Sequence, residues 1–391
     1  MDNVRPPPQA QGDRSAPSLA LWYIAGIAED SSPPLRGFSC SLSHVLISSV
    51  HAGFRRLYRI KIIDVAVLMS RPPPDPLYIL RGSGAAVNTL HFCCGGDGPP
   101  FLYSGSGKGA IHVWNLTTRR AEHVLESHAG NSVIWLHTFK DSSSSLISQG
   151  RDMRVCVWDL SEDRSTVTDS LLTGSVGFCQ CSLLESRPGS ALLAHPTEHM
   201  EEVSVVEMRS WTPVCTLKPD SKLGMLMCMK MWQADSGPVL CAGYEDGSLV
   251  LWDVSHRRPF SCLKVHPEPV MCLDIDVCRQ KGISGSSEKI LQSWTFDNQQ
   301  NLQMRDSVRM TNPGVSQLRI RADGKILATA GWDNNIRVFG LKKLKPLAVL
   351  QHHTDMVNSV AFSDHQDPPQ RLLAAGSKDQ RISVWSIYSE S

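Results

Sequence analysis

The sequence lacks an excess of charge of either sign. Its 391 residues contain 39 Lys and Arg against 38 Asp and Glu, which gives a net charge of +1. Proteins that bind nucleic acid through its phosphates usually carry a basic patch and a basic balance. We therefore expect no direct contact with nucleic acid.

Long apolar runs and a regular cysteine framework are also missing. Charged residues at Arg59, Lys61 and Asp64 interrupt the run 57–68, which is unsuited to crossing a bilayer. The run 19–28 has the length of a signal-peptide core, which is the alternative to a cytosolic chain. The twelve cysteines are scattered without a CxxC pair, as is typical of a reducing compartment. We expect a cytoplasmic location, with the nucleus as a second compartment, and no membrane contact.

What the sequence does contain is a phrase that recurs about every 45 residues, a period typical of repeat folds. The phrase combines a small residue, Gly, polar residues, an apolar alternation and an anchor aromatic. The clear copies end at Trp114, Trp158, Trp252, Trp294, Phe339 and Trp385. The interval from Trp158 to Trp252 spans two periods and predicts a hidden copy at 203–208, with Val206 at the position of the anchor Trp. Each copy holds four short alternating runs, as in a propeller blade, so we predict an all-β, seven-bladed propeller over 77–391.

The last copy lacks its outermost strand, because only six residues follow Trp385. A strand-like segment at about 76–82 precedes the first copy and has no blade before it. An open ring would expose two strand edges. We predict that this N-terminal segment, centred on Leu77–Arg81, pairs with the last blade and closes the ring.

The residues upstream of this closing segment show no blade period. Residues 1–18 and 29–37 are rich in Pro and Ser and are predicted to be disordered. We interpret 1–68 as an extension outside the propeller, and 69–76 as a Pro-rich lead that Met69 opens as a candidate translation start. A docking or targeting arm is the alternative for the extension.

The repeats resemble the WD40 family over residues 77–388. In that family a His before the first strand of a blade hydrogen-bonds the Asp of a tight turn, and the Trp indole finds a hydroxyl on the middle strand. The resemblance assigns the following residues to this blade network: His128, Asp152, Trp158, Asp246, Trp252, His266, Trp294, Asp333, His353, Asp379 and Trp385. Because the His–Asp pairs recur at equivalent blade positions, we interpret them as structural and not as catalytic.

Other motifs lack the context that their chemistry requires. The segment HPTEH (195–199) matches a zinc-protease pattern, but Pro196 and the flanking β runs exclude the necessary helix, so we predict a loop. The segment 105–110 lacks the first Gly and the Ser or Thr of a phosphate-binding loop. We expect no catalytic residue, no cofactor, no metal ion and no enzymatic activity.

A second set of positions predicts where partners bind. The residue before each turn Asp points toward one mouth of the ring, where propellers carry binding loops. We predict an interaction face that contains Arg151, Glu245, Trp332 and Lys378. In the degenerate third blade we expect Met200 at this position. Exposed Trp and Arg are typical anchors of interfaces, and the alternative for Trp332 is packing against blade five or seven.

Several phrases outside the general repeat resemble the family of guanine nucleotide-binding protein subunit beta-like proteins, among them SVGFC (175–179), KLGMLMCMKMWQAD (222–235) and TNPGV (311–315). The resemblance implies a non-catalytic adaptor that is monomeric within a complex. It links the chain to the Tel2–Tti1–Tti2 co-chaperone and to the stability of phosphatidylinositol-3-kinase-like kinases.

Two alternatives to an adaptor of this kind stay open. The first is a substrate receptor of a cullin ubiquitin ligase, which the lack of a W-D-x-R motif disfavours. The second is a G-protein β-like signalling subunit. It would carry an N-terminal coiled-coil helix, and no heptad pattern precedes Leu77.

Overall fold

The computed structural model describes residues 74–93, 101–126, 128–139, 142–161, 164–187, 190–363 and 371–387. These residues form 28 β-strands, and no α-helix occurs among them. In the same residues, no helix has the length and apolar character needed to span a membrane. The predicted extension 1–68 and the candidate start Met69 lie outside the described ranges.

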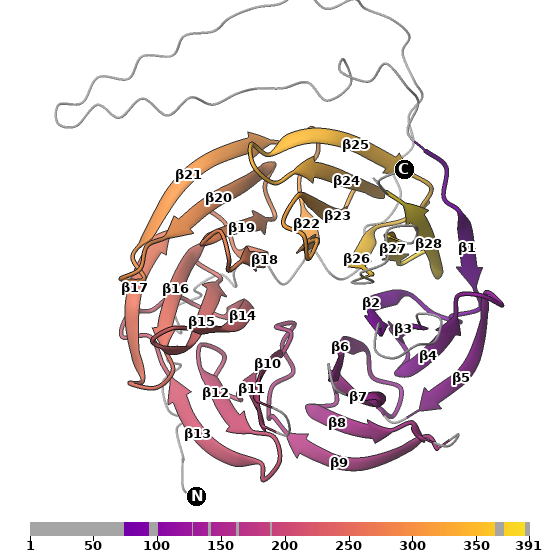
Figure 1. The fold of residues 1–391 in the computed structure, drawn as a ribbon, viewed down its shortest axis with the longest axis horizontal. Helices are drawn as coiled ribbons and strands as arrows, with labels where there is room; N and C mark the ends of the chain where they lie inside the picture. Colours follow the sequence, from indigo (N-terminus) through magenta and orange to yellow (C-terminus); the bar gives the residue numbers. More distant parts are fainter. Residues whose placement is uncertain are drawn as a thin grey trace, which may run out of the picture. The chain divides into compact units, whose positions relative to one another are not determined.

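The strands form seven four-stranded antiparallel sheets, or blades, around a central axis (Figure 1). Blade one contains β2 (Val87–Cys93), β3 (Phe101–Ser106), β4 (Ala110–Asn115) and β5 (Arg120–Glu126). Blade two contains β6 (Val133–Phe139), β7 (Ser142–Gly150), β8 (Arg154–Asp159) and β9 (Thr166–Leu172). Blade three contains β10 (Ser182–Arg187), β11 (Ser190–Pro196), β12 (Val203–Glu207) and β13 (Thr212–Leu217).

The remaining blades follow in the same order, from an inner to an outer strand. Blade four contains β14 (Leu226–Ala234), β15 (Gly237–Tyr244), β16 (Ser248–Asp253) and β17 (Arg258–Lys264). Blade five contains β18 (Val270–Asp276), β19 (Lys281–Ser286), β20 (Ile290–Phe296) and β21 (Leu302–Arg309). Blade six contains β22 (Val315–Ile320), β23 (Ile326–Gly331), β24 (Asn335–Gly340) and β25 (Lys345–Gln351). Blade seven contains β26 (Val357–Phe362), β27 (Leu372–Ser377), β28 (Arg381–Ser386) and β1 (Tyr78–Arg81).

The first strand of the chain closes the ring, as predicted. Strand β1 pairs antiparallel with β28, with Tyr78 opposite Val384 and Arg81 opposite Arg381. The backbone N–H of Leu77 adds a hydrogen bond to the carbonyl of Val384, at 2.8 Å. Strand β1 therefore gives blade seven its fourth strand and leaves no blade incomplete.

The hidden blade is also present. Leu193 on β11 lies opposite Val206 on β12, just as Leu146 on β7 lies opposite the anchor Trp158 in blade two. Val206 thus occupies the aromatic position of blade three, as predicted. The motif HPTEH differs from the expectation, because its first residue, His195, belongs to strand β11 and not to a loop.

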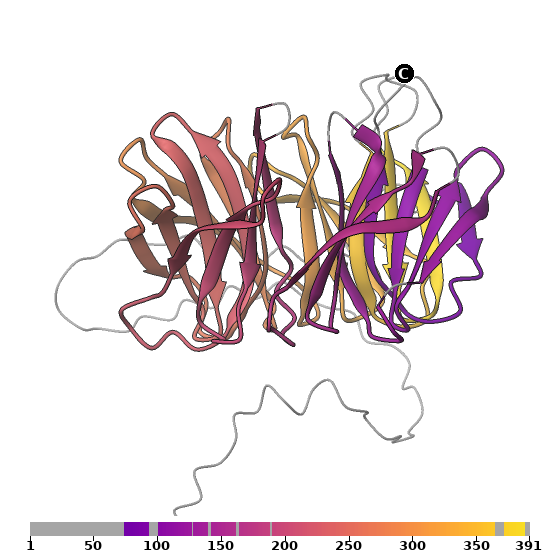
Figure 2. The same cartoon turned by 90° about the horizontal axis from the view of Figure 1, so that it is seen from below.

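Apolar clusters between neighbouring blades hold the ring together. One cluster joins blades six and seven and includes Val338, Leu350, Val360 and Trp385. Because the sheets are packed on both faces, their middle strands are largely buried, and β23 and β27 are buried along their whole length. Each fully buried large side chain of this kind contributes roughly 1.5–3 kcal/mol to folding. The side view in Figure 2 shows the blades standing side by side, with loops gathered at both ends of the ring.

Candidate functional site: the blade networks and an interaction face

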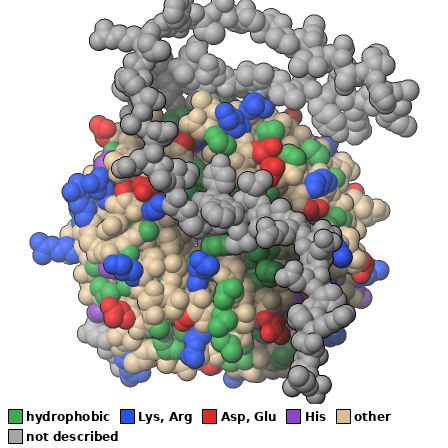
Figure 3. All heavy atoms as spheres, turned by 180° about the vertical axis from the view of Figure 1, so that it is seen from behind, with side chains coloured by type: hydrophobic (Ala, Val, Ile, Leu, Met, Phe, Trp, Pro, Cys, Tyr) green, Lys and Arg blue, Asp and Glu red, His purple; other side chains and the backbone are tan. Residues whose placement is uncertain are grey.

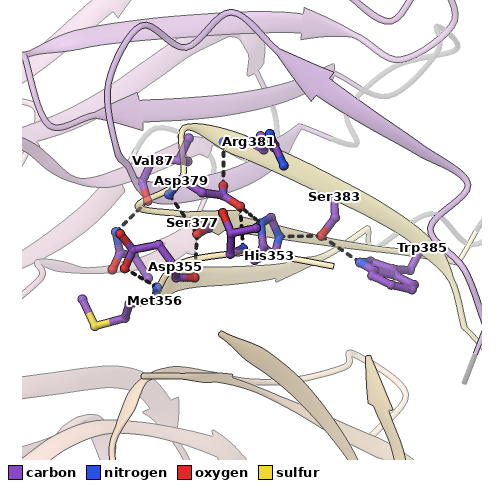
Figure 4. A network of polar contacts seen from close by, with 11 residues as sticks. Val87, His353, Asp355, Met356, Ser377, Asp379, Arg381, Ser383 and Trp385 are labelled. Carbon is purple, nitrogen blue, oxygen red and sulfur yellow. Dashed lines mark hydrogen bonds and ion pairs between the residues drawn. The ribbon is translucent and has the colours of Figure 1, made fainter. Parts of the chain in front are cut away.

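Blade seven holds a directed chain of buried hydrogen bonds (Figure 4). The indole N–H of Trp385 donates to Ser383 Oγ at 2.9 Å, and Ser383 Oγ lies 2.8 Å from His353 Nε2. On its other side, His353 Nδ1 lies 3.0 Å from Asp379 Oδ2. The Asp379 carboxylate also accepts backbone N–H groups of Thr354 and Arg381. This series of side-chain hydrogen bonds therefore holds together the turn, the third strand and the loop before the inner strand.

The electrostatics of this network keep its imidazole neutral. Burial lowers the pKa of His353, and the nearby Asp379 only partly offsets this effect. A neutral imidazole with its proton on Nδ1 donates to Asp379 and accepts from Ser383, which is the arrangement that the distances require. His353 is buried inside the blade, so this pair acts on structure and offers no accessible base.

Blade two contains the same network, but its hydroxyl group belongs to a different strand. His128 lies 3.0 Å from Asp152 and 2.8 Å from Ser148, and Trp158 donates to Ser148 at 2.9 Å. Ser148 is on the middle strand β7, as the family pattern implies. In blade seven the hydroxyl belongs to Ser383 on the third strand, because Ala375 occupies the middle-strand position opposite it.

Blade six replaces the imidazole by a guanidinium. Arg337, on the third strand β24, donates from Nη1 to Asp333 Oδ1 at 2.8 Å and from Nη2 to Asp333 Oδ2 at 2.5 Å. Asn312 donates a further hydrogen bond to Asp333, at 2.7 Å. Burial by itself would raise the pKa of Asp333, but the hydrogen bonds from Arg337 and Asn335 outweigh it and hold this pKa well below its usual range.

Blades four and five retain parts of the network. Asp246 accepts hydrogen bonds from the backbone N–H and the hydroxyl of Ser248, and Lys264 forms an ion pair with it at 3.6 Å. In blade five, His266 Nε2 lies 2.9 Å from Ser284 Oγ, and burial lowers the pKa of His266 to about 4. Within the described residues, the indole N–H of Trp294 has no hydrogen-bond partner. Trp252, like Trp294, is fully buried at its anchor position.

The predicted interaction-face residues occupy one equivalent position in four blades. The backbone N–H of each donates to the carbonyl just before the inner strand of its blade. These residues are Arg151, Glu245, Trp332 and Lys378. Because the same bond recurs, the structure brings all four to the same end of the ring.

The third blade differs from the expectation at this position. Counting from Leu193, which lies opposite the anchor position, places Glu198 and not Met200 in the equivalent place. The connection from Leu193 to Val206 is one residue longer than the equivalent connection in blade six, so counting backwards from Val206 reaches His199, and the expected Met200 lies one residue further away.

The side chains of the face are partly committed to neighbours. The indole of Trp332 lies across Gly314, which has φ +88° and has no room for a Cβ beneath the ring. Trp332 therefore packs on the entry to its own blade. Glu245 accepts a hydrogen bond from the backbone N–H of Met225 at 3.1 Å, and exposed Lys378 lies 3.9 Å from Asp355.

Arg151 leads to a surface that the repeat pattern did not reveal. Its guanidinium lies over the ring of Phe178, 4.4 Å from the centroid, and its Nε donates to the carbonyl of Val176. Five exposed apolar side chains lie in this region of blades two and three, and we call them the apolar rim: Met153, Leu172, Val176, Phe178 and Met200. Leu172 ends the outer strand β9, Met153 and Met200 lie in turns between a middle and a third strand, and Val176 and Phe178 lie in SVGFC between β9 and β10. Periodicity could not identify the residues in SVGFC, because this connection lies outside the repeat.

The described residues provide no grouping of three or more His, Cys, Asp or Glu that could hold a metal ion. On the side of the ring opposite to that of Figure 1, charged and apolar side chains are interspersed wherever the surface is uncovered (Figure 3).

Seven blades of four strands, with recurrent His–Asp and Trp–Ser hydrogen bonds, define a WD-repeat β-propeller. The family model "WD domain, G-beta repeat" matches residues 307–340 and 344–386. The chain is 51% identical over 323 residues to "Guanine nucleotide-binding protein subunit beta-like protein 1" of Mus musculus, covering 81% of this chain and 97% of that protein. The chain belongs to this family of WD-repeat proteins.

Fungal proteins are similar at lower identity. "ASTRA-associated protein 1" of Schizosaccharomyces japonicus is 28% identical over 381 residues, and that of Schizosaccharomyces pombe is 27% identical over 382 residues. Each comparison covers 81% of this chain and 99% of the fungal protein. As a propeller of this family, the chain is a scaffold for protein–protein interaction.

Proposed function

We propose that this protein is a non-catalytic adaptor that holds a co-chaperone assembly through the apolar rim and Arg151. Its partners in this proposal are the Tel2–Tti1–Tti2 co-chaperone and, through it, phosphatidylinositol-3-kinase-like kinases. The names of the fungal relatives, which associate them with ASTRA, support an assembly of this kind. The free thiols of the described residues support a reducing compartment, cytoplasmic with the nucleus as a second location.

The observation that carries the proposal is the chemistry of the apolar rim. Leu172, Met200 and Val176 are 67%, 65% and 59% exposed, while Arg151 is stacked on Phe178 beside them. Apolar side chains with this exposure gain by being covered, and a stacked Arg is held ready to pair with a carboxylate of a partner. Aromatic and Arg residues of this kind are typical energetic centres of interfaces.

Affinity purification of the full chain from cells tests this proposal. We expect Val176→Asp to lower the recovery of the co-chaperone subunits at least about tenfold, because a desolvated carboxylate opposes docking. Val124→Asp is the matched control, since Val124 is 51% exposed on the outer strand β5 of blade one. Both variants should unfold at the same temperature as the wild type. Undiminished recovery with Val176→Asp, while the subunits bind the wild type, would exclude the rim as the docking site.

A further inference from the structure

The inner strands place seven side chains at one level of the propeller axis. In each blade, one residue of the middle strand lies opposite the anchor residue. The next residue of the middle strand pairs with a residue of the inner strand, and these seven inner-strand residues lie at the same level. We call these residues the axial layer: His91, His137, Ser182, Lys230, Asp274, Arg319 and Ala361. The layer carries two permanent cations and a single carboxylate.

That carboxylate is already committed to other groups. Asp274 Oδ2 accepts the backbone N–H of Ile320 at 2.8 Å, and Oδ1 accepts the N–H of Ile275 at 3.0 Å. Lys230 forms an ion pair with Asp274 at 3.5 Å, and its side chain remains 43% exposed. Solvent therefore reaches the layer, and among the described residues no ion pair joins Arg319 to a carboxylate.

Arg319 instead reaches across the axis to a neutral acceptor. The amide N–H of Gln180 donates to the carbonyl of Ile134 at 2.8 Å, which turns Gln180 Oε1 toward the axis. This oxygen accepts from Gln317 at 3.3 Å and from Arg319 at 3.4 Å, although the latter pair is separated by 139 residues. A guanidinium at this distance from an amide oxygen is weakly bound compared with one that faces an anionic oxygen.

The imidazoles of the layer show that its surroundings are electropositive. His91 Nε2 accepts the backbone N–H of Thr138 at 3.1 Å, so the proton of His91 is on Nδ1 and the ring is neutral. His137 stacks on it at 4.8 Å and donates from Nδ1 to the carbonyl of Thr138. Burial holds the pKa of His91 well below its usual range, and the charges of His137, Arg319 and Lys230 lower it further.

We propose that the axial layer binds a small oxyanion of the phosphate type, which Arg319 and Lys230 hold in place of the Gln180 amide oxygen. The planar fork of Arg matches such an anion, and the confined setting strengthens its attraction. The smallest side chains of the layer lie in the blades next to the two cations, Ser182 beside Lys230 and Ala361 beside Arg319.

Titration of the purified full chain with phosphate and pyrophosphate tests this site, with chloride at matched ionic strength as the reference. We expect both anions to raise the thermal unfolding midpoint and to broaden in ³¹P NMR on binding. Arg319→Gln should weaken pyrophosphate binding at least about tenfold, the loss of one charge-assisted contact. Arg258→Gln is the control, because Arg258 is 68% exposed on the outer strand β17 and should bind like the wild type.

Three results would overturn the proposal. The first is the absence of binding by either phosphate probe, and the second is wild-type affinity in Arg319→Gln. The third is tighter binding of citrate than of pyrophosphate, which would assign a carboxylate ligand. If Arg319→Gln does not fold, Lys230→Gln decides, since the Lys230 side chain is 43% exposed and Asp274 keeps its two backbone N–H donors. Unchanged affinity in Lys230→Gln would then contradict the proposal.

Discussion

Blades six and seven solve the same structural problem with different chemistry. Blade seven ties its turn Asp379 to the neutral imidazole of His353, and its anchor Trp385 to a hydroxyl. Blade six ties Asp333 to the buried guanidinium of Arg337, and its anchor is Phe339. Because Phe has no N–H, blade six needs no hydroxyl beneath its anchor.

The difference shows that the turn carboxylate of a blade must accept hydrogen bonds, but that the donor can be either His or Arg. In blade seven the donor comes from the loop before the inner strand, whereas in blade six Arg337 reaches back from the third strand. An Arg–Asp pair carries full charges on both partners and a neutral His–Asp pair carries one. The two blades should therefore respond differently to truncation, to acid and to changes at the anchor.

Truncation of the two carboxylates should separate the blades most strongly. Asp333→Ala leaves the 6% exposed Arg337 side chain as an uncompensated buried charge, which should cost about 3–5 kcal/mol of unfolding free energy. Asp379→Ala leaves neutral donors without an acceptor and should cost about 1–3 kcal/mol. Urea unfolding of the two variants measures both values.

The double variant Asp333→Ala/Arg337→Leu provides the control for this comparison. It removes both charges and should be more stable than Asp333→Ala alone. Equal losses in Asp333→Ala and Asp379→Ala, or a double variant that is less stable than Asp333→Ala, would show that charge does not distinguish the two blades.

Acid should separate the blades that use His from the blade that uses Arg. Folding lowers the pKa of His266 from 6.5 to about 4, so the unfolded chain binds the proton more readily and stability falls as the pH falls through this window. The shift corresponds to a loss on the order of 3 kcal/mol at 1.36 kcal/mol per unit. His353, whose pKa is also lowered, adds a loss of the same sign that begins below pH 6.5. Asp333 contributes a loss only below its unfolded pKa of 3.8.

Urea unfolding at a series of pH values checks this expectation. His266→Gln should flatten the dependence between pH 6.5 and 4, while His123→Gln, at an exposed position of β5, should leave it unchanged. If the unfolding free energy of His266→Gln depends on pH as steeply as that of the wild type, burial of His266 is not the cause of this dependence.

The smallest effect should arise at the anchor position. Trp385→Phe gives blade seven the anchor of blade six and removes the hydrogen bond to Ser383, which should lower stability by about 1 kcal/mol. Differential scanning calorimetry measures the change, and Ser383→Ala/Trp385→Phe tests the coupling between the two side chains. Strictly additive losses would show that the indole–hydroxyl bond contributes nothing.

The architecture could be predicted because it follows from short-range patterns. Period two defined the strands, and the spacing of anchor aromatics gave seven blades with Val206 in the hidden one. The unmatched segment at β1 then closed the ring with β28. The equivalent turn positions of Arg151, Glu245, Trp332 and Lys378 were predictable, while their role as an interaction face stays a prediction. Glu198 was missed in part because the connection from Leu193 to Val206 has one additional residue.

Other features could not be read from these patterns. The hydroxyl of Ser383 comes from a neighbouring strand, and Arg337 takes the place of a His that would precede the blade. The inner strands carry β-bulges, such as the shift between Val315 and Gln317, so their facing residues cannot be counted from the sequence alone. Val176 and Phe178 of the apolar rim lie in a connection without a period.

By itself the sequence determined the number of blades, their order and the strand that closes the ring, because these depend on alternation and spacing along the chain. Only the tertiary structure decided which side chains meet between blades and across the axis. Such contacts join residues that are far apart in the chain, as Gln180 and Arg319 are. Their geometry depends on the bulges and on how the sheets pack, and local sequence preferences specify neither.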